Sequence, residues 1–299
     1  MLGRSVAEAL RSSPPEAIVA DEVVAVAREA DLFVLNLECC ISERGERWPD
    51  PAKPFFFRAP PKAVGLLSHL GVACVSLANN HALDFGTEAL LDTFEHLEAA
   101  GIAWAGAGAD EEAARSPARV NGLAVVAFAD HPEDYAAARG RPGIALDGPW
   151  VAETVRELAA TGPVLVTPHW GPNMTGQPVE RVRRRAPSLL EAGATLVAGH
   201  SAHVVHGVEG RVLWDLGDFL DDYAVHPRLR NDLGLLWLVE LDADGPTRIE
   251  AVPLALDFCF TRLAEGDEAA WIRQRLVGAC AAMGTDVAVE SGRLVIRPG

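Results

Sequence analysis

The chain has 299 residues, 49% of them hydrophobic, with a formal net charge of −16 and a sequence pI of about 4.9. An acidic surface of this size repels phosphate backbones, which argues against nucleic acid as a partner. The five cysteines are odd in number and lie mostly in apolar surroundings, which favours a reducing compartment over a disulfide framework. We find no signal peptide and no apolar run that could cross a membrane, so we expect the chain as given to be cytoplasmic, without a membrane partner.

The first two-thirds of the chain alternates helical and strand patterns. Helices are predicted at 5–11, 21–30, 61–70, 86–100, 151–160 and 179–192, and strands at 32–37, 73–77, 102–104, 123–128, 164–167 and 196–198. Thr87 is a candidate cap for the helix at 86–100. The continuous apolar run Leu32–Leu37 predicts a strand buried on both faces. A long loop is predicted over 42–61, and its three phenylalanines, Phe55–Phe57, either anchor it in the core or contact substrate.

The last third is richer in strands. These are predicted at 204–205, 212–214, 235–241 and 249–256, followed by one helix at 267–283 and a hairpin at 287–296 around Ser291-Gly292. Alternating helices and buried strands predict a largely parallel sheet, and the later strands predict a second sheet packed on it. We find no clear linker and expect a single domain over 1–299.

Residues that suit metal ligation follow four of the predicted strands. They are Glu38, Asn79-Asn80-His81, His169 and the pair His200 and His203. Sites in open α/β sheets gather at the carboxyl ends of strands, and imidazole, carboxylate and amide oxygen suit divalent transition metals. Taken alone, each has a structural explanation: a hydrogen-bonded histidine, a surface carboxylate or a turn. Their coincidence at four strand ends predicts a metal site whose chemistry stays open.

Five short motifs, in this order, resemble the CapA-like (poly-γ-glutamate and capsule synthesis) family. They are Asn36-Leu37-Glu38, Ala78–Gly86, His169-Trp170-Gly171, Gly199–Val204 and Leu216–Phe219. The resemblance is strongest over 1–225 and implies a calcineurin-like metallophosphatase fold. This is an α/β fold, a four-layer αββα sandwich with mixed sheets. Residues 226–299 would then supply the strands, helix and hairpin that complete the second sheet.

The resemblance also implies roles for individual side chains. It implies two divalent transition metal ions (Mn, Zn, Fe, Ni or Co), with the ligands Glu38, Asn80, His169, His200 and His203. His81 resembles a general acid/base beside the metals, with Asp84 orienting it. His206, which stands where the family typically has a glutamine, and Tyr223 add further candidate proton-transfer groups.

The chain departs from the family pattern in several places. The family's first strand and its metal-binding Asp precede a segment like Met1–Arg4, so we expect that strand to be truncated here through a start codon assigned too far downstream. Pro172–Met174, Ser201 and Asp218 replace a usual carboxylate, histidine and asparagine, which weakens the expectation of capsule-polymer chemistry. An acidic cluster is either a solvated loop or support for the ligand histidines; it comprises Asp215, Asp218, Asp221 and Asp222.

Three functions fit these residues. The first is a metal-dependent hydrolase of a phosphoester or amide-type bond in a small molecule or peptide, with metal-bound hydroxide as nucleophile and His81 as general acid. The second is a metal-dependent epimerase of the lasso-peptide type, which removes and returns a Cα proton. The third is a non-catalytic factor in capsule or poly-γ-glutamate assembly.

Overall fold

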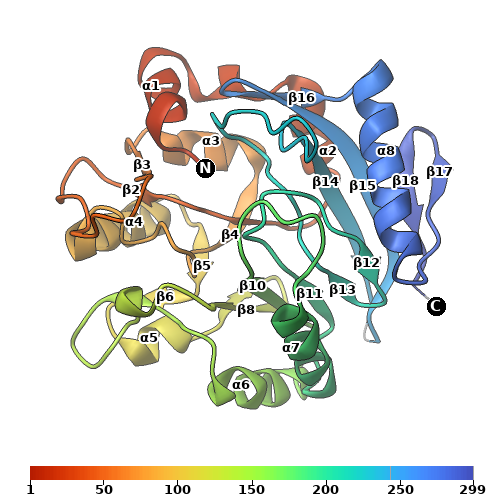
Figure 1. The fold of residues 1–299 in the computed structure, drawn as a ribbon. Coiled ribbons are helices and arrows are strands. Elements are labelled where there is room, and N and C mark those ends of the chain that lie inside the picture. Colours follow the sequence, from red (N-terminus) through yellow and green to blue (C-terminus); the bar gives the residue numbers. More distant parts are fainter. Residues whose placement is uncertain (243, 299) are drawn as a thin grey trace.

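The computed structural model describes residues 1–242 and 244–298 and has a mixed α/β fold (Figure 1). The described strands form a three-stranded, a six-stranded and a five-stranded sheet, plus two two-stranded ribbons. This confirms the predicted mixture of parallel and mixed sheets. Among the described helices, none is both long enough and apolar enough to cross a membrane.

Two of the sheets are built mainly from parallel strands. The three-stranded sheet has the order β1-β4-β5 and consists of β1 (Phe33–Asn36), β4 (Val72–Ser76) and β5 (Ala103–Ala105). The six-stranded sheet has the order β12-β13-β11-β10-β8-β7. Its four parallel strands are β8 (Leu123–Ala129), β10 (Val164–His169), β11 (Leu196–Ala198) and β13 (Val212–Leu213), and β7 (Ala118–Val120) and β12 (Val208–Glu209) are antiparallel edges. Parallel strands bring their carboxyl ends to one edge, which is where the candidate ligands follow.

Helices cover the outer face of the six-stranded sheet. They are α6 (Pro149–Ala159) and α7 (Glu180–Glu191), which lie together below the sheet in Figure 1. Val155 and Leu189 from these helices pack with Val126 and Val166 of the sheet in one apolar cluster. The neighbouring side chain Leu165 points to the opposite face, into a larger core, as alternation along a strand requires.

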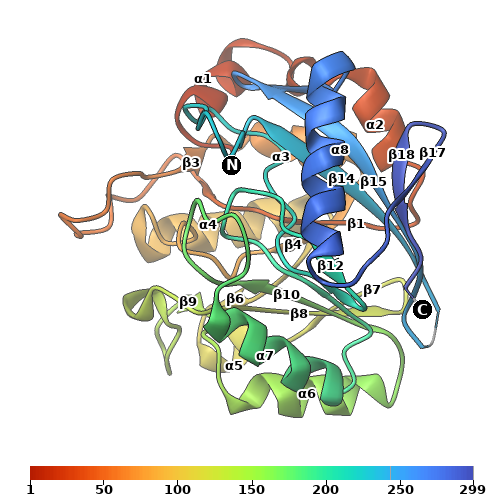
Figure 2. The ribbon, with the colours of Figure 1, turned by 45° about the vertical axis from the view of Figure 1, so that its right-hand side comes forward.

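Four further helices complete the first part of the chain. They are α1 (Arg4–Ser12), α2 (Asp21–Ala27), α3 (Ala63–Leu70) and α4 (Gly86–Ala99), with the short α5 (Glu111–Arg115). The third sheet is antiparallel, and α8 (Gly266–Ala281) lies along it (Figure 2). Its strands are β14 (Leu233–Leu241), β15 (Pro246–Asp257), β16 (Phe260–Leu263), β17 (Ala288–Glu290) and β18 (Arg293–Ile296). The β17–β18 pair confirms the predicted hairpin. The larger core includes both Leu2 and Ile296.

Some local predictions were wrong. No strand forms at 204–205, because left-handed backbone at Ser201 (φ 127°) and His203 (φ 58°) breaks the extended path. The helix predicted to reach residue 30 ends at Ala27, and Thr87 makes no capping hydrogen bond. Residues 32–36 of this run are only partly buried, because β1 lies at the edge of its sheet, whereas Leu37 is buried.

The long loop is anchored by one of its three phenylalanines. Phe57 is fully buried, whereas Phe55 is 46% exposed. Two short parallel strands bracket the loop: β2 (Cys40–Ile41) and β3 (Arg58–Ala59). The ribbon holds both ends of the loop together, and Lys53 in the loop donates to the Asn80 carbonyl in the turn after β4.

Candidate metal centre

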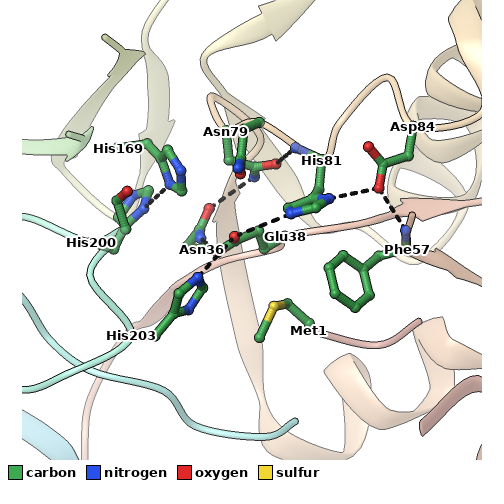
Figure 3. A network of polar contacts seen from close by, with 12 residues as sticks. Met1, Asn36, Glu38, Phe57, Asn79, His81, Asp84, His169, His200 and His203 are labelled. Carbon is green, nitrogen blue, oxygen red and sulfur yellow. Dashed lines mark hydrogen bonds and ion pairs between the residues drawn. The ribbon is translucent and has the colours of Figure 1, made fainter. Parts of the chain in front are cut away.

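Glu38 is held by amide groups at the ends of β1 and β4. Asn36 Nδ2 donates to Glu38 Oε2 at 2.9 Å, and Asn79 Nδ2 donates to Asn36 Oδ1 at 2.9 Å (Figure 3). A second bond, from Asn79 Nδ2 to the Leu37 carbonyl, ties the turn after β4 to β1. One oxygen of Glu38 is therefore fixed. The other, Oε1, is buried and has no hydrogen-bond partner in the described part of the chain.

The His81 ring is hydrogen-bonded to Asp84. His81 Nδ1 lies 2.7 Å from Asp84 Oδ2, and this fully buried carboxylate also accepts hydrogen bonds from the Phe57 backbone N–H at 2.6 Å and the Tyr135 hydroxyl at 3.1 Å. Lys53 Nζ lies 3.0 Å from Asp84 Oδ1. A carboxylate with three other donors presents only acceptor oxygens to the ring, so Nδ1 carries the proton that it donates. The other ring nitrogen, Nε2, faces the site.

His169 and His200 are placed side by side by adjoining strands. His169 is the last residue of β10, and His200 follows β11. The two histidines form a parallel β-bridge with each other. Their Nδ1 atoms lie 2.9 Å apart and share a hydrogen bond. Gly199 permits this packing, because a Cβ there would lie 2.4 Å from Trp170 Nε1.

Burial keeps these two imidazoles neutral. It lowers the pKa of His200 to about 3, and it lowers the pKa of His169, with the neighbouring His200 adding to the effect. Neutral imidazole is the form that binds metals. In both rings Nε2 is buried without a partner among the described residues.

His203 has the opposite electrostatic setting. Its Nδ1 lies 2.9 Å from Asp218 Oδ1, and its Nε2 lies 3.8 Å from Glu38 Oε1. Burial alone would lower the pKa of His203, but the charges of Asp218 and Glu38 outweigh it and raise that pKa to about 10. Its left-handed backbone is rare for a residue other than glycine, and such conformations cluster at functional sites.

The acidic cluster is buried, so its interpretation as a solvated loop was wrong. Asp215 accepts backbone hydrogen bonds from Ala202 at 2.8 Å and Gly217 at 3.0 Å, which fixes the turn that carries His203. Burial raises the pKa of Asp215 to about 7. Burial and the charge of Asp218 raise the pKa of Asp221 to about 8. Within the cluster, Asp215 and Asp218 thus support His203, whereas Asp222 binds the Ser5 backbone N–H and the Arg4 side chain.

His206 lies apart from the other candidates. Its Nε2 donates to the Thr175 carbonyl at 2.9 Å, and no described hydrogen bond or ion pair joins its ring to another predicted site residue. Burial lowers its pKa to about 4. Tyr223, by contrast, packs its ring edge-on against His203 with centroids 5.3 Å apart, and its hydroxyl donates to Met1 Sδ at 2.9 Å.

Comparison with known proteins identifies the family. The sequence matches the model of the family "Bacterial capsule synthesis protein PGA_cap" over residues 1–223. The chain belongs to this family. It is also 33% identical over 273 residues to a "Probable polyglutamine synthesis accessory protein" of Mycobacterium tuberculosis (strain H37Rv), covering 82% of this chain and 71% of that protein.

Two Bacillus relatives of the capsule synthesis protein family are more distant. The "PGA biosynthesis protein CapA" of Bacillus subtilis (strain 168) is 26% identical over 269 residues, which cover 85% of this chain and 69% of the relative. The "Capsule biosynthesis protein CapA" of Bacillus anthracis is 26% identical over 219 residues, which cover 68% of this chain and 52% of the relative. The predicted resemblance to the CapA family is thus confirmed.

The chain places four of its five predicted ligands in two groups, one of which also includes His81. Figure 3 shows Glu38, His81 and His203 facing one another, with His169 and His200 beside them. Within residues 1–242 and 244–298, no three His, Cys, Asp or Glu side chains converge closely enough to hold a metal ion as they stand. Each predicted ligand nevertheless has one buried polar atom without a hydrogen-bond partner among the described residues, although Glu38 Oε1 and His203 Nε2 lie within ion-pair distance at 3.8 Å. These atoms are Glu38 Oε1, Asn80 Oδ1 and the Nε2 atoms of His169, His200 and His203.

Some residues of the site escaped the sequence analysis. Lys53 binds both the Asp84 carboxylate and, at 2.6 Å, the Asn80 carbonyl, and Tyr135 closes the same network. Lys53 is one of only two lysines in the chain, a rarity that was available as a signal. Asn36 was visible as the one polar residue inside an apolar strand. Nothing in the sequence separates Tyr135 from an ordinary core aromatic.

Proposed function

We propose that this chain is a metal-dependent hydrolase of the calcineurin-like phosphoesterase type. It would act on a phosphoester or amide-type bond in a small molecule or peptide during synthesis of a capsule or poly-γ-glutamate polymer. Membership of the capsule synthesis family supports the biological setting. The carboxyl ends of parallel strands, where the candidate residues lie, support an enzyme site of the four-layer metallophosphatase kind.

The observation that carries the proposal is the set of unpartnered ligand atoms. Buried polar atoms are nearly always hydrogen-bonded, so each exception needs an explanation such as an ion. Among the predicted ligands, one carboxylate oxygen, one amide oxygen and three imidazole nitrogens are such exceptions, and Asp218 Oδ2 and Asp221 Oδ2 of the adjoining acidic cluster are two more. This donor set suits Mn, Zn, Fe, Ni or Co. Glu38, Asn80, His169, His200 and His203 would hold two such ions, which would supply Lewis-acid polarisation of the scissile bond.

The protein's own residues provide the proton transfer. Because Asp84 fixes the Nδ1–H of His81, the opposite nitrogen faces Glu38 Oε1 at 3.9 Å. A proton on Nε2 is therefore directed to a leaving group bound beside Glu38. The burial of Asp84 and its three other partners hold the His81 ring in one orientation, which avoids reorganisation during the reaction.

Turnover of p-nitrophenyl phosphate with added Mn²⁺ or Ni²⁺ tests this function. We expect metal-dependent release of p-nitrophenol, and a loss of about 10²- to 10⁴-fold in kcat for His81→Ala, the range typical of a general acid. His96→Ala, on α4 and outside the site, is the matched control and should retain activity. Metal-independent turnover, or equal rates for both variants, would contradict the assignment.

A non-catalytic role in polymer assembly is the second candidate. The specific observation in its favour is that no three charged or imidazole ligands converge among the described residues. Metal analysis separates the two functions: the hydrolase is expected to carry about two divalent ions per chain after incubation with Mn²⁺ and gel filtration. A chain that retains no divalent ion after this treatment would support the non-catalytic role.

Peptide epimerisation makes a different demand on the same side chains. It needs one proton acceptor and one proton donor on opposite faces of a Cα atom, and His81 and Tyr223 are the candidates nearest Glu38 and His203. His206, which was expected to contribute, bonds to Thr175 instead. Incubation of a peptide in D₂O with metal distinguishes the reactions, because epimerisation incorporates deuterium at Cα without cleavage.

A further inference from the structure

A histidine that the sequence analysis did not single out lies beside the candidate metal centre. His131 comes two residues after Ala129, the last residue of β8. β8 pairs in parallel with β10, and Ala129 stands opposite His169, so His131 lies at the same edge of the sheet as His169. The two imidazole rings are neighbours, with centroids 5.5 Å apart and planes inclined by 47°. Three adjacent parallel strands, β8, β10 and β11, thus each carry a histidine at or just beyond their carboxyl end.

Asp130 fixes the orientation of the His131 ring. Its Oδ1 is hydrogen-bonded to His131 Nδ1, and its Oδ2 accepts hydrogen bonds from the Gly171 backbone N–H at 2.9 Å and from Arg181 at 2.7 Å. A carboxylate that already accepts from a backbone amide and a guanidinium presents only acceptor oxygens to the ring. The proton shared with Asp130 is therefore carried by His131 Nδ1.

The other ring nitrogen of His131 is available to a ligand. Among the described residues, no hydrogen bond involves His131 Nε2, and the side chain is 36% exposed. With the proton on Nδ1, the Nε2 atom of the neutral ring is a hydrogen-bond acceptor. The predicted metal ligands His169, His200 and His203 are all buried. His131 is therefore the member of this histidine group that solvent and an incoming substrate can reach.

The segment from Asp130 to Tyr135 holds His131 in place relative to the rest of the site. The Asp130 N–H donates to the His169 carbonyl at 3.0 Å. At the other end of the segment, the Tyr135 hydroxyl donates at 3.1 Å to Asp84, the carboxylate that is hydrogen-bonded to the proposed general acid. Contacts to both parts of the site thus fix the position of His131, which precise contact with a substrate requires.

We propose that His131 is a substrate-binding residue whose Nε2 accepts a hydrogen bond from a hydroxyl or amide N–H next to the scissile bond. This inference rests on the proposed function, because it takes the metal centre as the place where substrate binds. Sites that hydrogen-bond a substrate group reject analogues without it, since the polar atom of the site is then left unpaired. Because His131 is partly exposed and water can satisfy it, we expect a selection of about 10- to 100-fold.

A role for His131 as a further metal ligand agrees less well with its surroundings. The five predicted ligands each contribute a buried polar atom without a hydrogen-bond partner among the described residues, and His131 Nε2 is not one of these buried atoms. An exposed acceptor is satisfied by water until a ligand replaces that water. The metal content of a His131 variant therefore distinguishes a ligand from a residue that contacts substrate.

A matched pair of phosphoesters tests the proposal by binding. Glycerol 2-phosphate and isopropyl phosphate share one carbon skeleton, but only the first carries hydroxyl groups. The measurement is the rate at which diethyl pyrocarbonate modifies His131 at pH 8, followed by peptide mass spectrometry on the Mn²⁺-treated chain. Glycerol 2-phosphate should halve this rate at a concentration at least tenfold lower than isopropyl phosphate does. His96, on α4 and outside the site, is the internal control and should be modified equally with either compound.

Two variants separate substrate recognition from a structural role. His131→Phe removes the acceptor and keeps a planar ring, whereas His131→Gln keeps an acceptor oxygen. The unmodified chain should release phosphate from glycerol 2-phosphate with a kcat/KM at least tenfold higher than from isopropyl phosphate. This ratio should fall to about one in His131→Phe and be partly retained in His131→Gln. A general loss of structure would lower both values and leave their ratio unchanged.

Several results would overturn the role of His131. Equal or absent protection by the two phosphoesters, or no modification of His131, would show that Nε2 does not receive a substrate donor. Loss of bound Mn²⁺ in His131→Phe would make the residue a ligand instead. Failure of the proposed hydrolase is a different result: the chain would turn over neither compound, while protection of His131 would still report on binding.

Discussion

Replacing His206 by glutamine is expected to remove a pH dependence of stability that its buried imidazole imposes. The ring is 4% exposed, and its Nε2–H bonds to the Thr175 carbonyl. Burial lowers its pKa from 6.5 to about 4. A glutamine side chain can also donate to that carbonyl but does not titrate. The substitution therefore keeps the hydrogen bond and removes the proton equilibrium.

The sign follows from the lowered pKa. Above pH 6.5 the imidazole is neutral in both the folded and the unfolded chain, so it does not lower the free energy of unfolding. As the pH falls from 6.5 toward 4, His206 binds a proton in the unfolded chain but stays neutral in the folded protein. Stability is therefore lost over this window. Each pH unit between the two pKa values corresponds to about 1.4 kcal/mol, which gives a loss of about 3 kcal/mol by pH 4.

Urea unfolding at pH 7.0 and pH 4.5 measures the effect. The free energy of unfolding of the unmodified chain should fall by about 2–3 kcal/mol more than that of His206→Gln between these pH values. Contributions from carboxylates cancel in this difference because both proteins contain them. Parallel losses in the two proteins would refute the assignment of His206 as a buried neutral side chain and would restore it as a candidate for proton transfer.

Three further substitutions test the site. Lys53→Met should lower kcat for p-nitrophenyl phosphate about 10- to 100-fold, because it removes a partner that positions Asp84, whereas Lys62→Met, which loses only a bond to a distant backbone carbonyl, should not. His200→Ala should lose bound metal, measured by mass spectrometry, with an unchanged circular dichroism spectrum; full metal occupancy would count against its role as a ligand. Gly199→Ala should lower the free energy of unfolding by at least about 2 kcal/mol, because the new methyl group would lie 2.5 Å from a backbone carbonyl.

Local pattern predicted most helices and strands because their apolar periodicity matched their final environment. The helical apolar pattern at 179–192 reflects burial on one face of α7. The continuous apolar run at 164–167 reflects burial on both faces of β10. The β17–β18 hairpin was predicted because Ser291-Gly292 supplies two left-handed residues at its turn. In these segments local and tertiary preferences agree.

The strand Leu32–Leu37 shows what pattern alone misses. Its composition predicted burial on both faces, and the described structure leaves it as an edge facing an apolar slot. A continuous apolar run predicts that both faces of a strand are buried. The position of the strand within the sheet depends instead on contacts between segments far apart in sequence.

The histidines were predicted from their positions after strands, but their protonation states depend on neighbours that spacing does not reveal. His200 and His203 are three residues apart, yet burial lowers the pKa of one to about 3 and carboxylates raise the pKa of the other to about 10. The deciding carboxylates are Asp218, fifteen residues further along, and Glu38, on a different sheet. A sequence window around Gly199 contains neither.

The buried carboxylates around Glu38 predict that metal binding releases protons. Glu38, Asp215, Asp218 and Asp221 crowd into one largely buried region, where carboxylates are costly without compensating cations. Protons supply part of that compensation: the pKa of His203 is raised to about 10, and those of Asp215 and Asp221 to about 7 and 8. A divalent ion beside Glu38 would replace protons, since metal ligands must be deprotonated.

Adding Mn²⁺ at pH 7 should therefore release at least about one proton per chain. Calorimetric titrations in two buffers of different ionisation enthalpy measure the number directly. His203→Gln should reduce it by about one proton, because the raised pKa of His203 keeps that ring protonated at pH 7, whereas burial keeps His169 and His200 neutral. His96→Ala, on α4, should release as many protons as the unmodified chain. Tight metal binding with no proton release would mean that the ion avoids His203, and the ligand set would have to be drawn from the remaining side chains.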